Sequence, residues 1–239
     1  MRSGAVVWSL CFVALTAEAQ VSDRLDPVHV DGRWDSVPFG LTLEDTATFV
    51  EKSLRWRHRE ALGTKDQSAR DALEARLESD AKAFREGLVA FQGQRTGYNI
   101  SVIDRDFAHD AGESMAVISV EKSHDYFFFQ GGRLWKLVTT DASKQSFSAL
   151  LVALTAALGA PAAIEYADAK KTEPVSARWV SDAFTVEAES KPQFSTRLVR
   201  WTWRAIGDNL KVTRGEKLPP GEQKTETMDP AILDIMNPD

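Results

Sequence analysis

Apolar residues recur at helical spacing in two stretches of the first half of the chain. The first stretch predicts a helix that begins after the capping residue Thr42, which Asp45 complements, and it is interrupted at Gly63. Its apolar stripe consists of Leu43, Ala47, Val50 and Leu54. The second stretch predicts a longer helix over 66–91, ended by Gly93 and Gly97, with a stripe formed by Leu73, Leu77, Ala81, Phe84, Leu88 and Phe91. A partner-binding or coiled-coil seam is the alternative use of this stripe, but it requires a longer run of heptads.

Beyond Gly97 the period changes from helical to alternating, which predicts strands. Tyr98, Ile100 and Val102 mark the first strand, and residues 115–120 form the second. The clearest local motif is a hairpin over 126–138, where Gly131 and Gly132 supply the positive φ angles of a tight turn. Strict alternation in its second arm places Leu134, Lys136 and Val138 on one face, with Trp135 and Leu137 on the other.

A third helix is predicted over 147–158, capped by Ser143 or Ser146 and ended by Gly159 and Pro161. Because it is apolar nearly all round, we expect it to be buried. Three strands follow, over 177–180, 184–188 and 197–206. The last has an aromatic face, formed by Arg197, Val199, Trp201, Trp203 and Ala205, and a cationic face, formed by Leu198, Arg200, Thr202 and Arg204.

This order of elements predicts an α+β fold in which antiparallel sheet packs against helices. The chain divides into two tandem helix-plus-sheet units, over 39–142 and 143–207. An extended lead-in, 20–38, precedes them. After Gly207 the composition turns to Lys, Glu, Pro and Thr, which predicts a flexible tail over 208–239 with a short apolar end.

The first nineteen residues have the three parts of a bacterial secretion signal. Arg2 supplies the positive charge, residues 5–15 the apolar run, and Ala17-Glu18-Ala19 the cleavage motif. We therefore expect cleavage after Ala19 and a periplasmic protein. An uncleaved anchor is the alternative, but the apolar run is shorter than the roughly 20 residues of a spanning helix. No stable membrane span is expected after cleavage.

Charge and cysteine content exclude several function classes. The net charge of −6 argues against binding to nucleic acid, which depends on a basic surface. Removing residues 1–19 takes away Arg2 and Glu18 and leaves this charge unchanged. The only cysteine, Cys11, lies in the apolar run of the signal. The mature chain therefore has no disulfide, thiolate zinc site or thiol nucleophile.

Two segments carry a resemblance to known proteins. PFGLTLEDTATFVEKSL (38–54) looks like the opening element of small bacterial envelope domains, and YFFFQGGRLWKLV (126–138) is similar to their hairpin. Two families share this pattern: the small lipoproteins of the outer-membrane barrel-assembly machine and the β-lactamase inhibitory proteins, the latter built as tandem helix-plus-sheet units. This sequence lacks the lipoprotein cysteine of the first family and the cysteines of the second. The resemblance implies a protein-binding module without a catalytic site.

Candidate catalytic and metal-binding groups lack the necessary spacing. The loop 104–113 holds four carboxylates and His109, but Ala108 and His109 occupy the fifth and sixth positions, where a calcium loop needs a ligand and a glycine. We expect a solvated connection there. The four histidines lack the spacing of zinc hydrolases, and the serines near His124 lack a nucleophile elbow. No cofactor or metal is therefore expected.

These observations predict a non-catalytic binding or scaffold component of a cell-envelope assembly, with a protein as its partner. The residues expected to contact that partner are Trp201, Trp203, Ile232, Leu233, Ile235 and Met236. A core position is the alternative for the tryptophans, and a self-docked turn for the terminal residues. Two other functions stay open: a periplasmic hydrolase acting on cell-wall or lipid substrates with the loop 104–113 at its site, and an inhibitor of a periplasmic enzyme.

Overall fold

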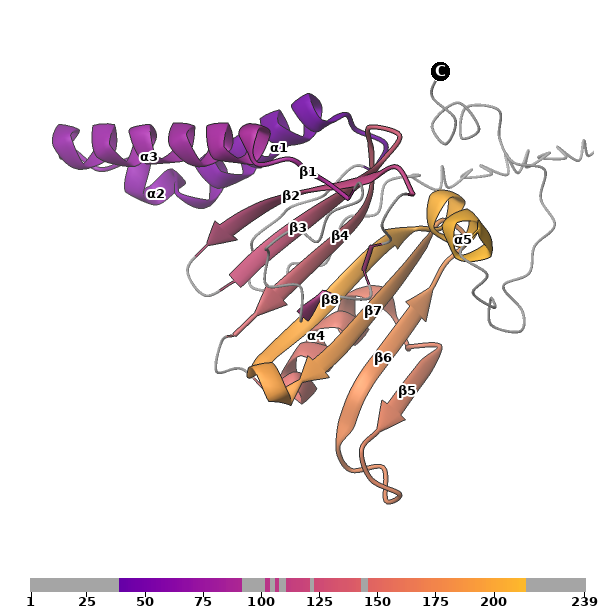
Figure 1. The fold of residues 1–239 in the computed structure, drawn as a ribbon. Helices are drawn as coiled ribbons and strands as arrows, with labels where there is room; N and C mark the ends of the chain where they lie inside the picture. The colour runs from indigo at the N-terminus through magenta and orange to yellow at the C-terminus, as the bar shows by residue number, and fades with distance from the viewer. Residues whose placement is uncertain are drawn as a thin grey trace, which may run out of the picture.

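The computed structural model describes residues 39–91, 102–103, 106–107, 111–120, 123–142 and 146–213. These residues form an α+β protein built on one antiparallel sheet of eight strands (Figure 1). The predicted secretion signal, the lead-in 20–38 and the terminal residues 232–236 lie outside them. No helix in the described ranges is both long and apolar enough to cross a membrane.

The first helix follows the predicted pattern. Helix α1 (Leu43–Arg57) is capped by Thr42, whose side chain accepts a hydrogen bond from the backbone N–H of Asp45 at 3.2 Å. The stripe of α1 faces the sheet and is buried at Ala47, Val50 and Leu54. A short helix, α2 (Arg59–Leu62), connects it to α3 (Gln67–Glu86), which is capped by Asp66.

Helix α3 is shorter than its apolar period predicts, because Gly87 takes the C-cap position instead of Gly93 or Gly97. The next residues form β1 (Val89–Ala90), which pairs with β2, so hydrogen bonding to the sheet overrides the helical period. Leu88 is consequently exposed, and Phe91 is buried on the face of the sheet opposite α3. The strand expected at Val102 is not observed there, since Val102 lies outside every described strand; Tyr98 and Ile100 lie outside the described residues.

The predicted hairpin is confirmed. It joins β3 (Ser123–Gln130) to β4 (Arg133–Asp141), with φ angles of 52° at Gly131 and 72° at Gly132. β2 (Glu113–Val120) pairs with β3 on its other side. Strict alternation in β4 is wrong, because a bulge leaves Trp135 without an opposite residue. Leu134 and Leu137 therefore share one face, and Trp135 and Lys136 both lie on the other.

The second half contains α4 (Phe147–Leu158), β5 (Ala163–Tyr166), β6 (Pro174–Val180), β7 (Phe184–Lys191) and β8 (Thr196–Trp203), with a short 3₁₀ helix, η2 (Pro192–Phe194), between the last two strands. Ser146 caps α4, as one of the two predicted alternatives. Full burial of α4 is wrong. Its residues Leu150 and Leu154 are buried, whereas Val152 on the outer side is 70% exposed.

The end of the chain differs from the prediction. β8 ends at Trp203, and Arg204–Thr213 form a further helix, α5, where the end of a strand and the start of a flexible tail were expected. Ile206 and Leu210 are one helical turn apart, and both are buried against the sheet. This burial explains why a segment of polar composition folds as a helix here.

The strand order is β1-β2-β3-β4-β8-β7-β6-β5, so the last strands of the two halves, β4 and β8, pair at the centre. Helices α1, α3 and α4 share one continuous core on what we call the covered face. In Figure 1, α1 and α3 lie at the β1–β4 end of the sheet, and α4 lies behind the other half. On the opposite face a smaller apolar cluster, which includes Phe91, Ile103, Ile206 and Leu210, lies against β2, β3, β4 and β8. Charged side chains, together with Ser176, Thr185 and Thr202, lie on the part of that face formed by β5 to β8.

Candidate functional site

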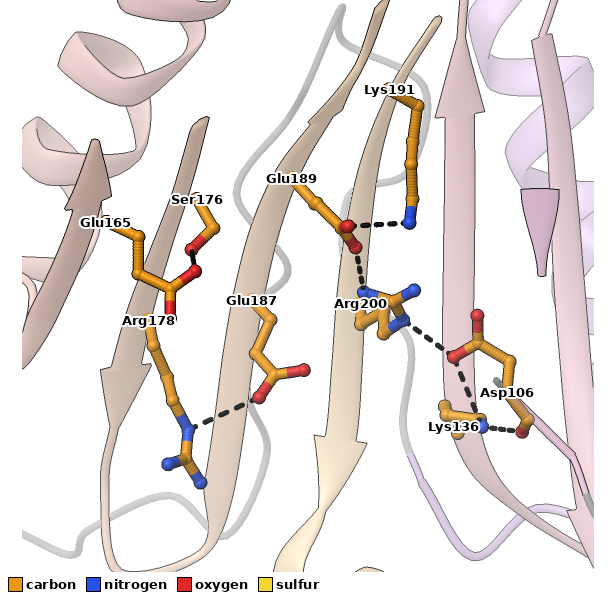
Figure 2. A network of polar contacts seen from close by, with 9 residues as sticks. All are labelled: Asp106, Lys136, Glu165, Ser176, Arg178, Glu187, Glu189, Lys191 and Arg200. Carbon is orange, nitrogen blue, oxygen red and sulfur yellow. Dashed lines mark hydrogen bonds and ion pairs between the residues drawn. The ribbon is translucent and has the colours of Figure 1, made fainter. Parts of the chain in front are cut away.

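A pocket of about 540 Å³ lies on the opposite face of the sheet, where the smaller apolar cluster ends. Its lining comes from the five strands β4, β8, β7, β6 and β5. Gly207 of α5 and Asp106, which lies between β1 and β2 in the chain, complete it. Seven charged side chains contribute to this lining: Asp106, Lys136, Glu165, Arg178, Glu187, Glu189 and Arg200. Figure 2 shows them side by side across the strands. We call this cavity the charged pocket.

Strand register brings the central charges together. Arg178 of β6, Glu187 of β7 and Arg200 of β8 are directly opposite one another in the antiparallel ladder. Their neighbours along the strands, such as Val186 and Trp201, point into the core of the covered face, because successive side chains of a strand alternate between faces. Arg178 forms an ion pair with Glu187 at 3.3 Å between Nε and Oε1.

Asp106 forms the inner end of the charged pocket. The side chain of Asp106 is only 2% exposed, which corrects the expectation of a solvated loop at this position. Its Oδ1 accepts from Arg200 Nε at 2.7 Å and lies 3.4 Å from Lys136 Nζ. Lys136 also donates to the main-chain oxygen of Asp106. These contacts offset the cost of burying the carboxylate, since Asp106 pairs with both cations that β4 and β8 bring to this face.

Lys136 is buried at the centre of the sheet. Its ammonium group lies 4.4 Å from the ring centre of Phe128 and 4.7 Å from that of Trp135. Burial lowers the pKa of Lys136 to about 8, although the negative charge of Asp106 works in the other direction. Arg200 lowers this pKa further, because it adds a second positive charge nearby.

Glu189 extends the network toward solvent. Its carboxylate accepts from Arg200 Nη1 at 2.9 Å and pairs with Lys191 Nζ at 2.6 Å. Burial of Glu189 favours the protonated form, but hydrogen bonds from Lys191 and Arg200 outweigh it and lower the pKa. Burial also disfavours the charged form of Arg200, yet the pKa of this guanidinium is raised, because Asp106 and Glu189 stabilise its charge.

The carboxylates at the mouth of the charged pocket are more exposed than the cations they pair with. The side chain of Glu187 is 38% exposed and that of Arg178 21%. Glu189 is 26% exposed, against 12% for Arg200. Glu165 is exposed on β5 and accepts a hydrogen bond from Ser176 Oγ at 2.8 Å. The pocket therefore presents mainly negative charge to solvent, with the cations beneath.

The predicted partner-binding residues lie elsewhere or outside the described ranges. Trp201 is 2% exposed in the core of the covered face, which is the core position given as the alternative for this residue. Trp203 is half-buried and packs against the apolar cluster of the opposite face. Ile232, Leu233, Ile235 and Met236 are not among the described residues. Leu198, Arg200 and Thr202 share the opposite face, as the alternation predicts. Arg200 is paired there with Asp106 and Glu189, and Arg204 belongs to α5 instead of the strand.

A serine–histidine contact occurs elsewhere on the sheet. Ser119 Oγ lies 2.8 Å from His124 Nδ1, because the two residues are opposite each other on β2 and β3. His124 is exposed, and Asp125, the next residue of the strand, is fully buried on the other face. The acid of a catalytic triad therefore does not come from Asp125. Within the described ranges no group of three or more His, Cys, Asp or Glu side chains is arranged to hold a metal ion.

The sequence contains part of the signal for the charged pocket. Charged residues alternate with apolar ones at Arg178, Glu187 and Arg200, all within predicted strands, whereas Glu189 lies one residue beyond the strand predicted over 184–188. The sequence did not reveal which strands pair, and this pairing is what brings these charges together in one pocket. No protein-family model matches the chain, and no curated protein or solved structure matches it either.

Proposed function

We propose that the protein is a non-catalytic binding or scaffold component of a bacterial cell-envelope assembly, and that the charged pocket contacts its partner. The observation that carries this proposal is a charged cavity on the half of the sheet that α5 and the smaller apolar cluster leave uncovered. The secretion signal expected from residues 1–19 supports a location in the envelope.

The ion pairs of the charged pocket favour binding over turnover. Asp106 is held by two cations, and Glu187 by Arg178, so both carboxylates are engaged in ion pairs within the protein. Lys136 has a pKa near the physiological range, but Asp106 and two aromatic rings enclose its ammonium group. Fixed charges of this kind give a binding surface its specificity and orient the partner.

The hydrolase alternative receives no support from the described part of its loop. Asp106 of this loop is engaged by Lys136 and Arg200. His109 and Asp110 lie outside the described residues.

Photocrosslinking in living cells tests the proposal. A photoreactive amino acid replaces Glu187 in the pocket, and a matched variant carries it at Glu78 of α3, whose side chain is 67% exposed. We expect a discrete protein adduct from position 187 in the periplasmic fraction and none from position 78. Adducts from position 78 alone, equal adducts from both positions, or no adduct from position 187 would contradict the proposed role of the pocket. Accumulation of the protein in the cytoplasm would contradict its location.

A further inference from the structure

We infer that the charged pocket recognises a cationic polypeptide segment, whose lysine or arginine side chains pair with its carboxylates. This inference rests on the proposed binding function and names the chemical class of the partner.

The charge of the lining favours a cationic ligand. The lining residues alone include four carboxylates and three cations, a formal net charge of −1, and Lys191 pairs with Glu189 from outside the lining. The more exposed member of each pair at the mouth is the carboxylate, Glu187 over Arg178 and Glu189 over Arg200. Glu165 is exposed and is paired with no cation in the described part of the chain. An approaching anion would meet this negative rim before it reached the recessed guanidinium groups.

A second feature is an unsatisfied acceptor on Asp106, at the inner end of the pocket. Oδ2 of Asp106 is buried and accepts no hydrogen bond from the described residues. A buried carboxylate oxygen without a donor is unfavourable, because it has lost its hydration without compensation. An ammonium or guanidinium group bound at the inner end of the pocket would supply this donor once the side chains that cover Oδ2 shift, because the oxygen has almost no accessible surface. A carboxylate or phosphate would add a further acceptor and leave Oδ2 unsatisfied.

The extent of the pocket favours a polypeptide over a small amine. Its acidic groups are distributed from Glu165 on β5 to Asp106, which contacts Lys136 on β4. These two strands are separated by β6, β7 and β8. Neighbouring strands lie about 4.8 Å apart, so the groups extend over about 19 Å. An extended segment of about six residues covers this length and directs alternate side chains to the sheet.

Calorimetric titration of the purified protein with defined peptides tests the inference. The probes are a blocked hexapeptide of alternating lysine and serine, its glutamate counterpart, and lysine amide. We expect the lysine hexapeptide to bind, the glutamate hexapeptide not to bind, and lysine amide to bind at least tenfold more weakly than the lysine hexapeptide. Glu187→Gln and Glu165→Gln should each weaken binding about tenfold, which corresponds to one charge-assisted hydrogen bond.

Glu78→Gln on α3 is the matched control, because it makes the same change of net charge away from the pocket. It should leave the affinity unchanged. Glu165 is exposed on an edge strand, so Glu165→Gln keeps the test valid if Glu187→Gln fails to fold. An equal loss in Glu78→Gln, or equal affinity for lysine amide and the lysine hexapeptide, would overturn the inference.

The failure of the inference can be distinguished from that of the proposed function. Preferential binding of the glutamate peptide would overturn the cationic class but leave the pocket as a binding site. If no peptide binds but position 187 still gives a crosslinked adduct, the cationic class is likewise overturned and the pocket remains a binding site. Absence of both peptide binding and the adduct would remove the proposed function as well.

Discussion

Lys136 makes the stability of the fold depend on pH in a defined direction. Burial lowers its pKa from 10.5 to about 8 in the folded protein, whereas the unfolded chain keeps the ordinary value. Between these two pH values the unfolded chain binds more protons than the folded chain. The free energy of unfolding therefore rises as the pH increases through this window. A shift of this size corresponds to about 3 kcal/mol of unfolding free energy.

The substitution Lys136→Met isolates this contribution. Methionine has an unbranched side chain that can occupy the space beside Phe128 and Trp135, and Asp106 keeps its ion pair with Arg200. Because the variant has no titrating group at this position, its free energy of unfolding should lack the increase with pH that Lys136 causes. We expect the stability of the wild-type protein to increase relative to the variant by about 3 kcal/mol between pH 8 and pH 10.5.

Urea unfolding, followed by circular dichroism at constant ionic strength, measures this difference at several pH values from 7 to 10.5. Other groups that titrate in this range contribute to both proteins, including Tyr126, whose pKa burial raises. Their effects cancel in the difference. Parallel curves would refute a lowered pKa at Lys136. A wild-type protein that lost stability relative to the variant as the pH rose would show that Asp106 stabilises the ammonium group more than burial penalises it.

Three further substitutions test packing and backbone geometry by urea or thermal unfolding. Asp141→Ala leaves Arg197 buried without its ion-pair partner and should cost about 3–5 kcal/mol; an unchanged stability would mean that water reaches the pair. Gly132→Ala places a Cβ at a φ of 72° and should cost about 1–2 kcal/mol, so an unaltered melting temperature would contradict the turn geometry. Leu154→Ala should cost about 2–5 kcal/mol, whereas Val152→Ala on the exposed side of α4 should be nearly neutral. Equal losses at these two positions would show that α4 is covered on both sides.

Local signals in the sequence predicted the elements whose physical cause lies within a few residues. Thr42 and Ser146 cap helices because their hydroxyl groups accept from a backbone N–H three residues later. The hairpin turn depends on two adjacent glycines that adopt positive φ. The α+β class followed from the same signals, because the helical and alternating periods are read over single elements.

The bounds of several elements depended on contacts with other parts of the chain. Helix α3 ends at Gly87 because the following residues pair with β2, and α5 forms because Ile206 and Leu210 are buried against the sheet. The bulge at Trp135 moves Lys136 to the face of Asp106. Each of these contacts involves a residue outside the segment whose structure it changes. The apolar period of the segment alone therefore gave the wrong end for α3, no helix at α5 and the wrong position for the side chains of β4.

By itself, the sequence determined where most helices and strands begin, the hairpin at Gly131-Gly132 and the mixed α+β class, because hydrogen bonds and φ preferences of neighbouring residues decide these features. Tertiary structure alone decided that β4 pairs with β8 and that the charged pocket exists. Asp106 and Arg200 are 94 residues apart in the chain and 2.7 Å apart in the fold. The position and balance of these charges follow from strand order and register, which depend on the packing of the whole sheet.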